Sequence, residues 1–374
     1  MQKKYSRQTA RFSGCVEKYV KMYEEAAMIG RLMRVYHLYA TSLYYAIRKK
    51  TTSRNKRKFV FLLLTPSLLL VCCVSYLYEH TIKRMINQWH SMNDMCRKFE
   101  YEIVYVAIAK NEGPYIREWI EYHRQVGVQK FLIYDNESTD QMRTLLEPYI
   151  QKGLVDYTYF PGRAKQLDAY YDALKKYRKR ARYMGFFDLD EFVVPVEKKT
   201  LVDVIQEILN KNPFAGGVAI NWYVYGSAGH KTKPQGLVME NYLYRAKDDY
   251  RNNHCVKTVV NPRLTKGYIF DPHTPTYFCG YHSVTEKGMI VDGPWNEYPN
   301  NSYEKIRINH YYCKSEEEGK IKFNRGLATH EENVKNDWKK YAEFDRNDVY
   351  DDCILCYRDC VKQALNVLEK NRGN

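Results

Sequence analysis

Three carboxylates close a short apolar run near the middle of the sequence. Asp188, Asp190 and Glu191 follow directly on the residues YMGFF at 183–187. Burying carboxylates without partners is costly, so a metal ion, basic side chains or open solvent must neutralise them. Residues two apart on a strand point to the same face, which predicts that Asp188 and Asp190 lie together. Because Mg²⁺ and Mn²⁺ prefer oxygen ligands and often bind carboxylates together with substrate phosphates, this DXD motif predicts a divalent-metal site that holds a diphosphate.

Apolar, β-branched runs alternate with helical patterns around these acids. The predicted strands cover 103–109, 130–136, 154–160 and 183–195, and the predicted helices cover 113–127, 138–150 and 164–181. Strands that alternate with helices in this way are typical of βαβ units. We therefore expect an α/β domain with a mainly parallel central sheet.

Polar residues follow three of the predicted strands. These residues are AKNE at 109–112, YDNES at 134–138 and DLDE at 188–191. Ligands of α/β sheets bind outside the carboxyl ends of the strands. The three groups are therefore expected to converge on one rim and to form a binding site there.

Three stretches of the sequence carry a resemblance to a known family. VAIAKNEGPYIREWIEYHRQVGVQKFLIYDNESTD begins at Val106, FFDLDEFVVP at Phe186 and INHYYCKSEEEGKIKFNRG at Ile308. In this order they resemble glycosyltransferase family 92 and the related family-2-like transferases, over about residues 104–326. The resemblance implies a GT-A, Rossmann-like fold and an inverting transfer of a sugar from a nucleotide-sugar donor to a glycan or other hydroxyl acceptor. It also implies a UDP-sugar as the donor, galactose as one candidate sugar, and Mn²⁺ or Mg²⁺ as the cofactor.

The resemblance further implies which residues contact the donor nucleotide. The loop after the first strand is expected near the base and ribose, and the acid that closes the second strand is expected to contact the base. Two positions on the third helix are expected to face the nucleotide. The implied contacts are Ala109, Asn111, Glu112, Asp135, Asn136, Ser138, Gln166, Asp172 and Asp188.

The metal ligands are also assigned by the resemblance. Asp190 is the expected main ligand, and Asp188 is expected near the metal or the ribose. The family motif NHYY places His310 as a late ligand, with His273 and His282 as alternatives. Cationic side chains of the same late motif are expected to stabilise the leaving diphosphate together with the metal; they are Lys314, Lys322 and Arg325.

An inverting transfer requires a base that takes the proton of the acceptor hydroxyl. Glu191, Glu316 and Glu317 are the candidates, and no motif chooses between them. Glu191 has an alternative role, in which it caps the strand or accepts a hydrogen bond from a backbone amide. Trp222 and Tyr225 are candidates for packing against the acceptor sugar, and a core position is the alternative for both.

The positive charge of the chain is concentrated at its N-terminal end. The formal net charge is +15, of which residues 1–58 carry +12 and the remainder +3. A nearly neutral main domain without an RNA-binding motif is not expected to bind nucleic acid. A basic tail favours a membrane surface as its partner instead.

Residues 59–78, FVFLLLTPSLLLVCCVSYLY, contain no charge and follow the basic stretch RNKRK. This segment is long enough to span a bilayer with its basic flank in the cytoplasm; a buried helix or an interfacial hairpin bent at Pro66 is the alternative. The catalytic domain would then face the Golgi lumen in a eukaryote. In a bacterium it would stay at the cytoplasmic face on a monotopic anchor. The expected parts are a basic helical tail (1–58), the membrane segment (59–78), a stem (79–100), the GT-A domain (101–330) and a C-terminal helical extension (331–374).

Two other functions compete with sugar transfer. A nucleotidyltransferase usually binds a triphosphate with a glycine-rich basic loop, whereas the corresponding loop AKNEGP carries an acid, Glu112, beside Lys110 and has one glycine. A membrane-anchored, non-catalytic binding protein on a degenerate GT-A fold is the main alternative. The intact pair Asp188 and Asp190, together with His310, counts against it.

Overall fold

The computed structural model describes residue 70 and residues 97–197, 199–269, 271–278, 280–296, 301–325 and 338–370. The expected tail at 1–58, the expected membrane segment at 59–78 apart from Leu70, and the stem up to residue 96 lie outside these residues. Within the described parts, no helix is both long and apolar enough to cross a membrane. The described residues from 97 onward belong to one compact unit, His90–Asn374.

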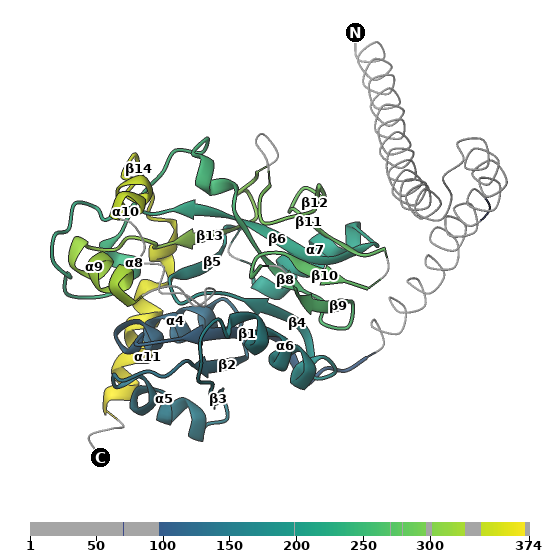
Figure 1. The fold of residues 1–374 in the computed structure, drawn as a ribbon, viewed down its shortest axis with the longest axis horizontal. Helices are drawn as coiled ribbons and strands as arrows, with labels where there is room; N and C mark the ends of the chain where they lie inside the picture. Colours follow the sequence, from purple (N-terminus) through teal and green to yellow (C-terminus); the bar gives the residue numbers. More distant parts are fainter. Residues whose placement is uncertain are drawn as a thin grey trace, which may run out of the picture. The chain divides into compact units, whose positions relative to one another are not determined.

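The first half of this unit is a series of βα units (Figure 1). Its elements are β1 (Tyr101–Ala109), α4 (Gly113–Gln125), β2 (Lys130–Asp135), α5 (Met142–Gln151), β3 (Val155–Tyr159), α6 (Gln166–Tyr177) and β4 (Ala181–Phe186). β1 pairs in parallel with β2 and β4, and β2 pairs in parallel with β3. β1 is buried from its third residue onward, which explains why its sequence is continuously apolar rather than alternating.

The second half extends the sheet with both parallel and antiparallel strands. Its elements are β5 (Glu191–Pro195), α7 (Leu201–Lys211), β6 (Ala215–Val224), α8 (Val238–Asn241), β7 (Tyr244–Arg245), η2 (Arg251–His254), β8 (Val256–Val260), β9 (Thr265–Tyr268), β10 (Pro275–Tyr277), β11 (His282–Val284), β12 (Ile290–Val291) and β13 (Ile306–His310). β8 lies antiparallel between β4 and β6, and β13 pairs with both β5 and β6. Five of the nine strand pairs in this ten-stranded sheet are parallel, which confirms the expected α/β class with a mainly parallel sheet.

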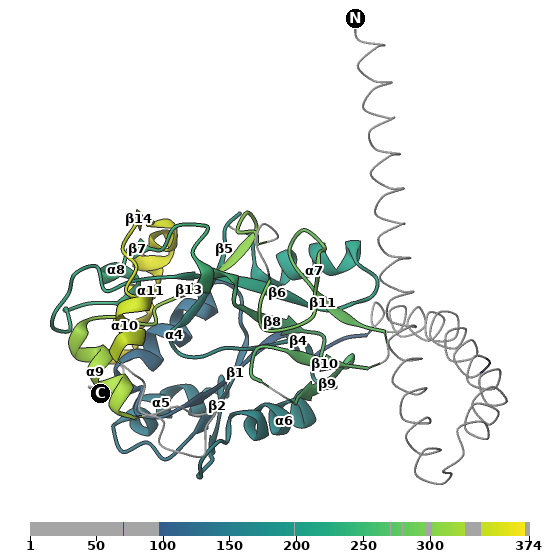
Figure 2. The same cartoon turned by 45° about the horizontal axis from the view of Figure 1, so that its top comes forward.

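The described residues from 316 onward are mostly helical and pack into the same core. Their elements are α9 (Glu316–Arg325), α10 (Trp338–Phe344), β14 (Val349–Tyr350), η3 (Cys353–Tyr357) and α11 (Arg358–Lys370). α11 lies beside α4 in both views of the ribbon (Figures 1 and 2). Val361 and Leu368 of α11 are buried in the large cluster that contains Trp119 of α4. The described residues 338–370 are therefore built into the α/β unit.

The predicted strand at 183–195 is in fact two strands. β4 ends at Phe186, a turn follows at Asp188–Asp190, and β5 begins at Glu191. The prediction that Asp188 and Asp190 share one face of a strand is therefore wrong. β4 pairs with β1 and β8 whereas β5 pairs with β13, so the chain changes partners here and has to turn.

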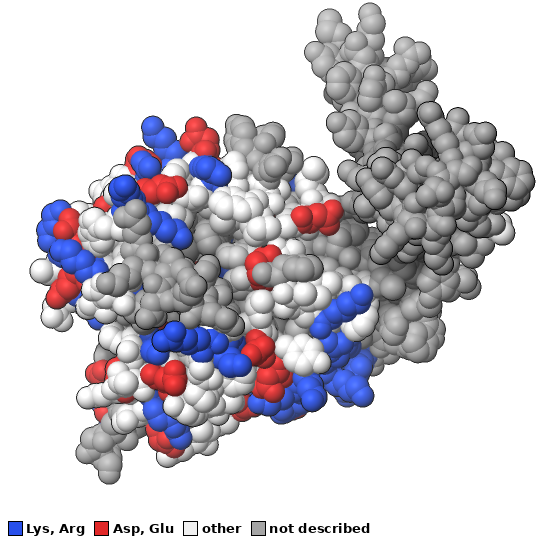
Figure 3. Space-filling model, viewed as in Figure 1, with Lys and Arg blue, Asp and Glu red and all other residues white. Residues whose placement is uncertain are grey.

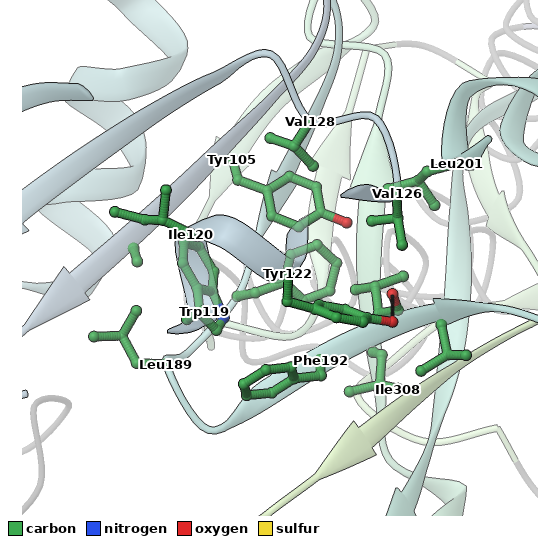
Figure 4. Packing of buried hydrophobic residues seen from close by; sticks show 14 of the residues in the cluster. Tyr105, Trp119, Ile120, Tyr122, Val126, Val128, Leu189, Phe192, Leu201 and Ile308 are labelled. Carbon is green, nitrogen blue, oxygen red and sulfur yellow. Dashed lines mark hydrogen bonds between the residues drawn. The ribbon is translucent and has the colours of Figure 1, made fainter. Parts of the chain in front are cut away.

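Aromatic side chains of α4 hold the strand that follows this turn. Trp119 donates a hydrogen bond from Nε1 to the carbonyl of Glu191 (2.9 Å), and the Tyr122 hydroxyl donates to the carbonyl of Val193 (3.0 Å). The Val193 amide donates to Nε2 of His123 (3.1 Å). Trp119 and Tyr122 pack in the buried cluster of Figure 4. The helix after the first strand thus fixes the position of β5, and with it one end of the acidic turn.

The charges on the surface are mostly mixed. On the face shown in Figure 3, Lys and Arg side chains alternate with Asp and Glu over most of the described surface, and a group of basic side chains gathers near α6. This distribution follows from the small net charge of the chain after residue 58.

Candidate active site

The loops after β1 and β2 are joined by hydrogen bonds between backbone and side chain. The Asn111 amide donates to Oγ of Ser138 (2.9 Å), and the Thr139 amide donates to Oδ1 of Asn111 (2.7 Å). Asn111 has a φ of 55°, a left-handed conformation that Asn adopts more easily than most residues. The structure thus brings the predicted residues Asn111 and Ser138 together at the carboxyl ends of neighbouring strands.

Asp135, at the end of β2, is buried and bonded through both of its oxygens. Oδ1 accepts from the Ser138 amide (2.9 Å) and Oδ2 accepts from the Tyr157 hydroxyl (2.5 Å). Asn136 follows it; its amide donates to the carbonyl of Ala109 (2.8 Å) and its side chain donates to the carbonyl of Phe160 (2.9 Å). These predicted nucleotide contacts therefore form one hydrogen-bonded rim.

Only one of the two residues predicted on α6 reaches the acidic turn in the described structure. Nε2 of Gln166 donates to Oδ1 of Asp188 (3.0 Å). Asp172 instead accepts from the Tyr134 hydroxyl (2.7 Å) and pairs with Lys176 (2.6 Å). Gln166 therefore contacts the acidic turn, whereas Asp172 is bonded to β2 and to its own helix.

Asp188 is neutralised by a lysine that the sequence reasoning missed. Nζ of Lys257, on β8, lies 3.0 Å from Oδ2 of Asp188 and 3.6 Å from Oε2 of Glu191. Lys257 and Glu191 are completely buried. Burial works against the charge of Lys257, but Asp188 and Glu191 hold its pKa well above the ordinary value. A single charge inside the apolar strand VKTVV was the signal that could have identified Lys257.

Glu191 takes the structural role that the sequence left open. Its Oε2 accepts a hydrogen bond from the Asp188 amide (2.8 Å), which closes the turn. Burial raises the pKa of Glu191 to about 8, and Lys257 opposes this rise. A completely buried carboxylate bonded within its own turn is poorly placed to reach an acceptor hydroxyl.

Asp190 faces the other way, toward β13 and α9. Nζ of Lys322 donates to its Oδ2 (2.6 Å), and Nε2 of His310 lies 3.7 Å from the same oxygen. Burial opposes ionisation of Asp190, but Lys322 and His310 hold its pKa well below the usual range. Burial lowers the pKa of His310, and the Asp190 carboxylate opposes this shift. The acids of the turn are therefore neutralised by basic side chains in this structure.

Asp190 and His310 are suited to hold a divalent cation. A carboxylate and a neutral imidazole are both ligands of such ions, and Mg²⁺ and Mn²⁺ commonly complete their coordination with water and substrate phosphates. Within the described ranges no group of three or more His, Cys, Asp or Glu side chains could hold a metal. Among the described residues the buried Nδ1 atom of His310 has no hydrogen-bond partner, and the ring centroids of His310 and Trp222 lie 4.1 Å apart. The residues thus fit a metal that is shared with a substrate.

The alternative histidines are placed differently. His273 also packs against Trp222, at 5.3 Å between ring centroids, and its Nδ1 is 2.9 Å from the Val256 carbonyl. His282 begins β11, where it pairs with Ala215. In the described structure His310 is the one of the three that forms a pair with Asp190.

The remaining predicted residues surround α9 and the start of α4. Lys314 is buried with its Nζ 3.9 Å from the centre of the Tyr115 ring, and burial lowers its pKa, which the carboxylate of Glu112 opposes. Glu316 pairs with Lys231, and Glu317 accepts from the Lys233 amide (2.8 Å). Arg325 is the last residue of α9, and its side chain lies outside the described structure.

Trp222 and Tyr225, the predicted acceptor-stacking residues, have different surroundings. Trp222 packs against His310 and is therefore part of the site. Tyr225 is completely buried beside Tyr311, at 4.9 Å between ring centroids. Tyr225 is thus a core residue, the alternative that the sequence allowed.

Comparison with known proteins gives a family match. The family model described as glycosyltransferase family 92 matches residues 108–347. A glycosyltransferase family 92 protein of Ricinus communis is 25% identical over 233 residues, which is 62% of this chain and 39% of that protein. A family 92 protein of Oryza sativa subsp. japonica is 26% identical over 250 residues, 65% of this chain and 39% of that protein. The chain therefore spans about two fifths of the length of these curated relatives.

Partial matches extend to other transferases. The galactan β-1,4-galactosyltransferase GALS2 of Arabidopsis thaliana is 29% identical over 136 residues, 33% of this chain and 26% of that protein. Among solved structures, Staphylococcus aureus TarS residues 1–349 with UDP-GlcNAc has a TM-score of 0.29 at 17% identity and covers 44% of this chain and 46% of that one. This structural score is too low to support an argument on its own.

Proposed function

The chain belongs to glycosyltransferase family 92, and on this premise we propose that it transfers a sugar from a nucleotide-sugar donor to a hydroxyl group of a glycan or other acceptor. The observation that supports this best is that His310 of β13 and Lys322 of α9 both approach the same oxygen, Oδ2 of Asp190 in the acidic turn. Asp190 follows β4 in sequence, as the nucleotide rim follows β1 and β2, at the strand ends where α/β proteins bind ligands.

The donor nucleotide would be held at the hydrogen-bonded rim. Asp135, Asn136 and Ser138 are fixed there, and Asn111 joins their loop to the one after β1. Gln166, at the start of α6, donates to Asp188, whose side chain is 40% exposed. A base and ribose bound along this rim would place the diphosphate beside Asp190.

Asp190 and His310 would hold Mn²⁺ or Mg²⁺ there. Such an ion, when bound, stabilises the negative charge that develops on the leaving nucleoside diphosphate. Lys322 would bind the same diphosphate, because its ammonium is already at Asp190 and only 22% of its side chain is exposed. Lys314 would add a second, buried positive charge.

We expect the transfer to invert the anomeric configuration, with Glu316 or Glu317 as the base. Both carboxylates lie on α9, six and five residues before Lys322, about 7–9 Å along the helix axis. They are partly accessible and bonded to the segment that carries Lys231 and Lys233, whereas Glu191 is buried. The base must come within hydrogen-bond distance of the acceptor hydroxyl, which favours Glu316 and Glu317 over the buried Glu191.

We propose a UDP-sugar as donor, with galactose as the first sugar to test, because the galactan β-1,4-galactosyltransferases match part of this chain. Attachment to a membrane through residues 59–78 also stays a prediction, since these residues lie outside the described structure apart from Leu70. The alternative function is a non-catalytic binding protein, which would retain nucleotide affinity but turn over no donor.

The test is a panel of nucleotide sugars offered to the full-length chain with Mn²⁺, with and without chelator. Asp190→Asn is compared with Asp203→Asn, an exposed aspartate at the start of α7. The proposal expects hydrolysis or transfer from one donor, dependent on metal and lost in Asp190→Asn alone. Binding of a nucleotide without turnover of any donor would favour the non-catalytic alternative, and no binding by the folded protein would refute both.

A further inference from the structure

Lys257 is a charged side chain in the middle of an apolar strand. It lies on β8, whose five residues are all buried, and its own side chain is completely inaccessible. An ammonium group in such a place is strongly unfavourable unless carboxylates surround it. The two acidic side chains near its ammonium, the carboxylate of Asp188 and the carboxyl group of Glu191, both belong to the acidic turn.

The contacts of Lys257 fix one residue of that turn in particular. Its Nζ is 3.0 Å from Oδ2 of Asp188, and Nε2 of Gln166 is 3.0 Å from the other oxygen. Glu191, the second partner of Lys257, accepts from the Asp188 amide (2.8 Å). Asp188 is thus held at both carboxylate oxygens and at its backbone.

The two aspartates of the turn have different basic partners. Lys257 lies at Asp188, whereas Lys322 and His310 lie at Asp190. The Asp188 side chain nevertheless remains 40% exposed. A carboxylate has about four lone-pair sites, so one bond at each oxygen leaves capacity for hydroxyl donors from a ligand.

We propose that Lys257 is a positioning residue for the donor: it holds the Asp188 carboxylate in the orientation that accepts hydrogen bonds from the ribose hydroxyl groups of the nucleotide. Lys257 does not touch the donor itself, because it is completely buried. This inference rests on the proposed function, and it extends that function with a residue outside the three sequence stretches that resemble the family.

Lys130 provides a matched control for a buried lysine on the same sheet. It is 4% exposed, lies at the start of β2, and its Nζ is 2.5 Å from Oδ1 of Asp156. Replacing it with methionine removes the same charge from a similar pair. Lys130 lies at the amino end of β2, whereas the nucleotide rim lies at the carboxyl end, after Asp135.

The experiment measures how strongly the full-length chain distinguishes UDP from its 2′-deoxy and 3′-deoxy analogues, by calorimetry with chelator present. We expect the wild type and Lys130→Met to prefer UDP over at least one analogue by about tenfold, the effect of one hydrogen bond to a charged group. In Lys257→Met that preference falls to about twofold or less, because Asp188 is no longer oriented. Lys257→Gln, which keeps a hydrogen-bond donor, serves if Lys257→Met does not fold, and it is expected to retain part of the preference.

A double-mutant cycle separates positioning from a general loss of stability. In the Asp188→Asn background, Lys257→Met should change UDP affinity by less than about twofold, since its partner carboxylate is gone. The inference is overturned if folded Lys257→Met keeps the full preference for UDP, if Lys130→Met loses it equally, or if the wild type binds UDP and both analogues equally. A wild type that binds no nucleotide at all refutes the proposed function and the inference with it.

Discussion

The Nζ atom of Lys322 lies 2.6 Å from Oδ2 of Asp190, across 132 residues of sequence. The same ammonium donates to the carbonyl of Tyr312 (3.0 Å) and lies 3.9 Å from the centre of the Tyr312 ring. One cation therefore links α9, the segment after β13 and the acidic turn. A diphosphate bound beside Asp190 would therefore lie close to the ammonium group of Lys322.

Lys322→Gln is expected to lower kcat for donor hydrolysis by about 100-fold, because a group that stabilises the leaving diphosphate is removed. KM for the donor should change far less, since the nucleotide rim is untouched. Steady-state kinetics with a saturating metal concentration measures both. Lys320→Gln, an exposed residue of the same helix, is the control and should retain wild-type kcat. Equal losses in the two variants would remove Lys322 from the mechanism.

His310→Gln is expected to weaken Mn²⁺ binding by about tenfold or more in the presence of UDP. Nε2 of His310 lies 3.7 Å from Oδ2 of Asp190 and burial lowers its pKa, whereas Nδ1 of His273 lies 2.9 Å from the Val256 carbonyl. Electron paramagnetic resonance of free Mn²⁺ measures the affinity without relying on turnover. His273→Gln should bind Mn²⁺ as the wild type does. The reverse pattern would make His273 the metal ligand.

His123 is expected to make the folded state less stable in acid. Burial lowers its pKa to about 3, and its Nε2 must stay unprotonated to accept from the Val193 amide. The unfolded chain, with a His pKa of about 6.5, therefore binds the extra proton between pH 6.5 and 3. Stability should rise with pH in this window by up to about 1.4 kcal/mol per pH unit from this residue, and fall as the pH is lowered through it.

Urea unfolding of the wild type and His123→Gln at several pH values tests this prediction. The difference in unfolding free energy between the two proteins reports on His123. Glu118 and Glu191, whose pKa values are raised to about 7 and about 8, are present in both proteins and cancel in this difference. Those two contribute stability that is lost as the pH rises, the opposite sign. Parallel pH profiles for the two proteins would show that His123 does not titrate as expected.

Gly185→Ala is expected to destabilise the fold by about 1–3 kcal/mol through overpacking. A Cβ at this position of β4 would lie 2.7 Å from the ring of Tyr105 and would also meet the ring of Phe187. Chemical denaturation measures the loss. Gly267→Ala is the matched control on β9, because its Cβ would meet Tyr171 only at an ordinary 3.8 Å. Similar losses in both variants would contradict the packing argument.

The early strands and helices could be predicted because their signals are local. β1 is an apolar run, α4 begins near Pro114, and polar residues follow each strand where a loop must begin. The nucleotide rim at Asn111, Asp135 and Ser138 follows from these signals, since parallel neighbours end at the same edge of the sheet. The antiparallel strand β8 has no such local signal, because its direction in the sheet depends on its pairing with β4 and β6.

The sequence by itself determined the family, the α/β class and the chemical types of the site residues, since these depend on residue identity and on spacing along the chain. The tertiary structure decided which groups meet. Asp188 and Asp190 look alike in sequence, yet one faces Lys257 and the other faces Lys322 and His310. The physical reason is that β13 pairs with β5 in the register that sets His310 opposite Glu191, while β8 joins β4 through a different part of the sheet. Such a register is fixed by the burial of many strands at once, and no short stretch of sequence contains it.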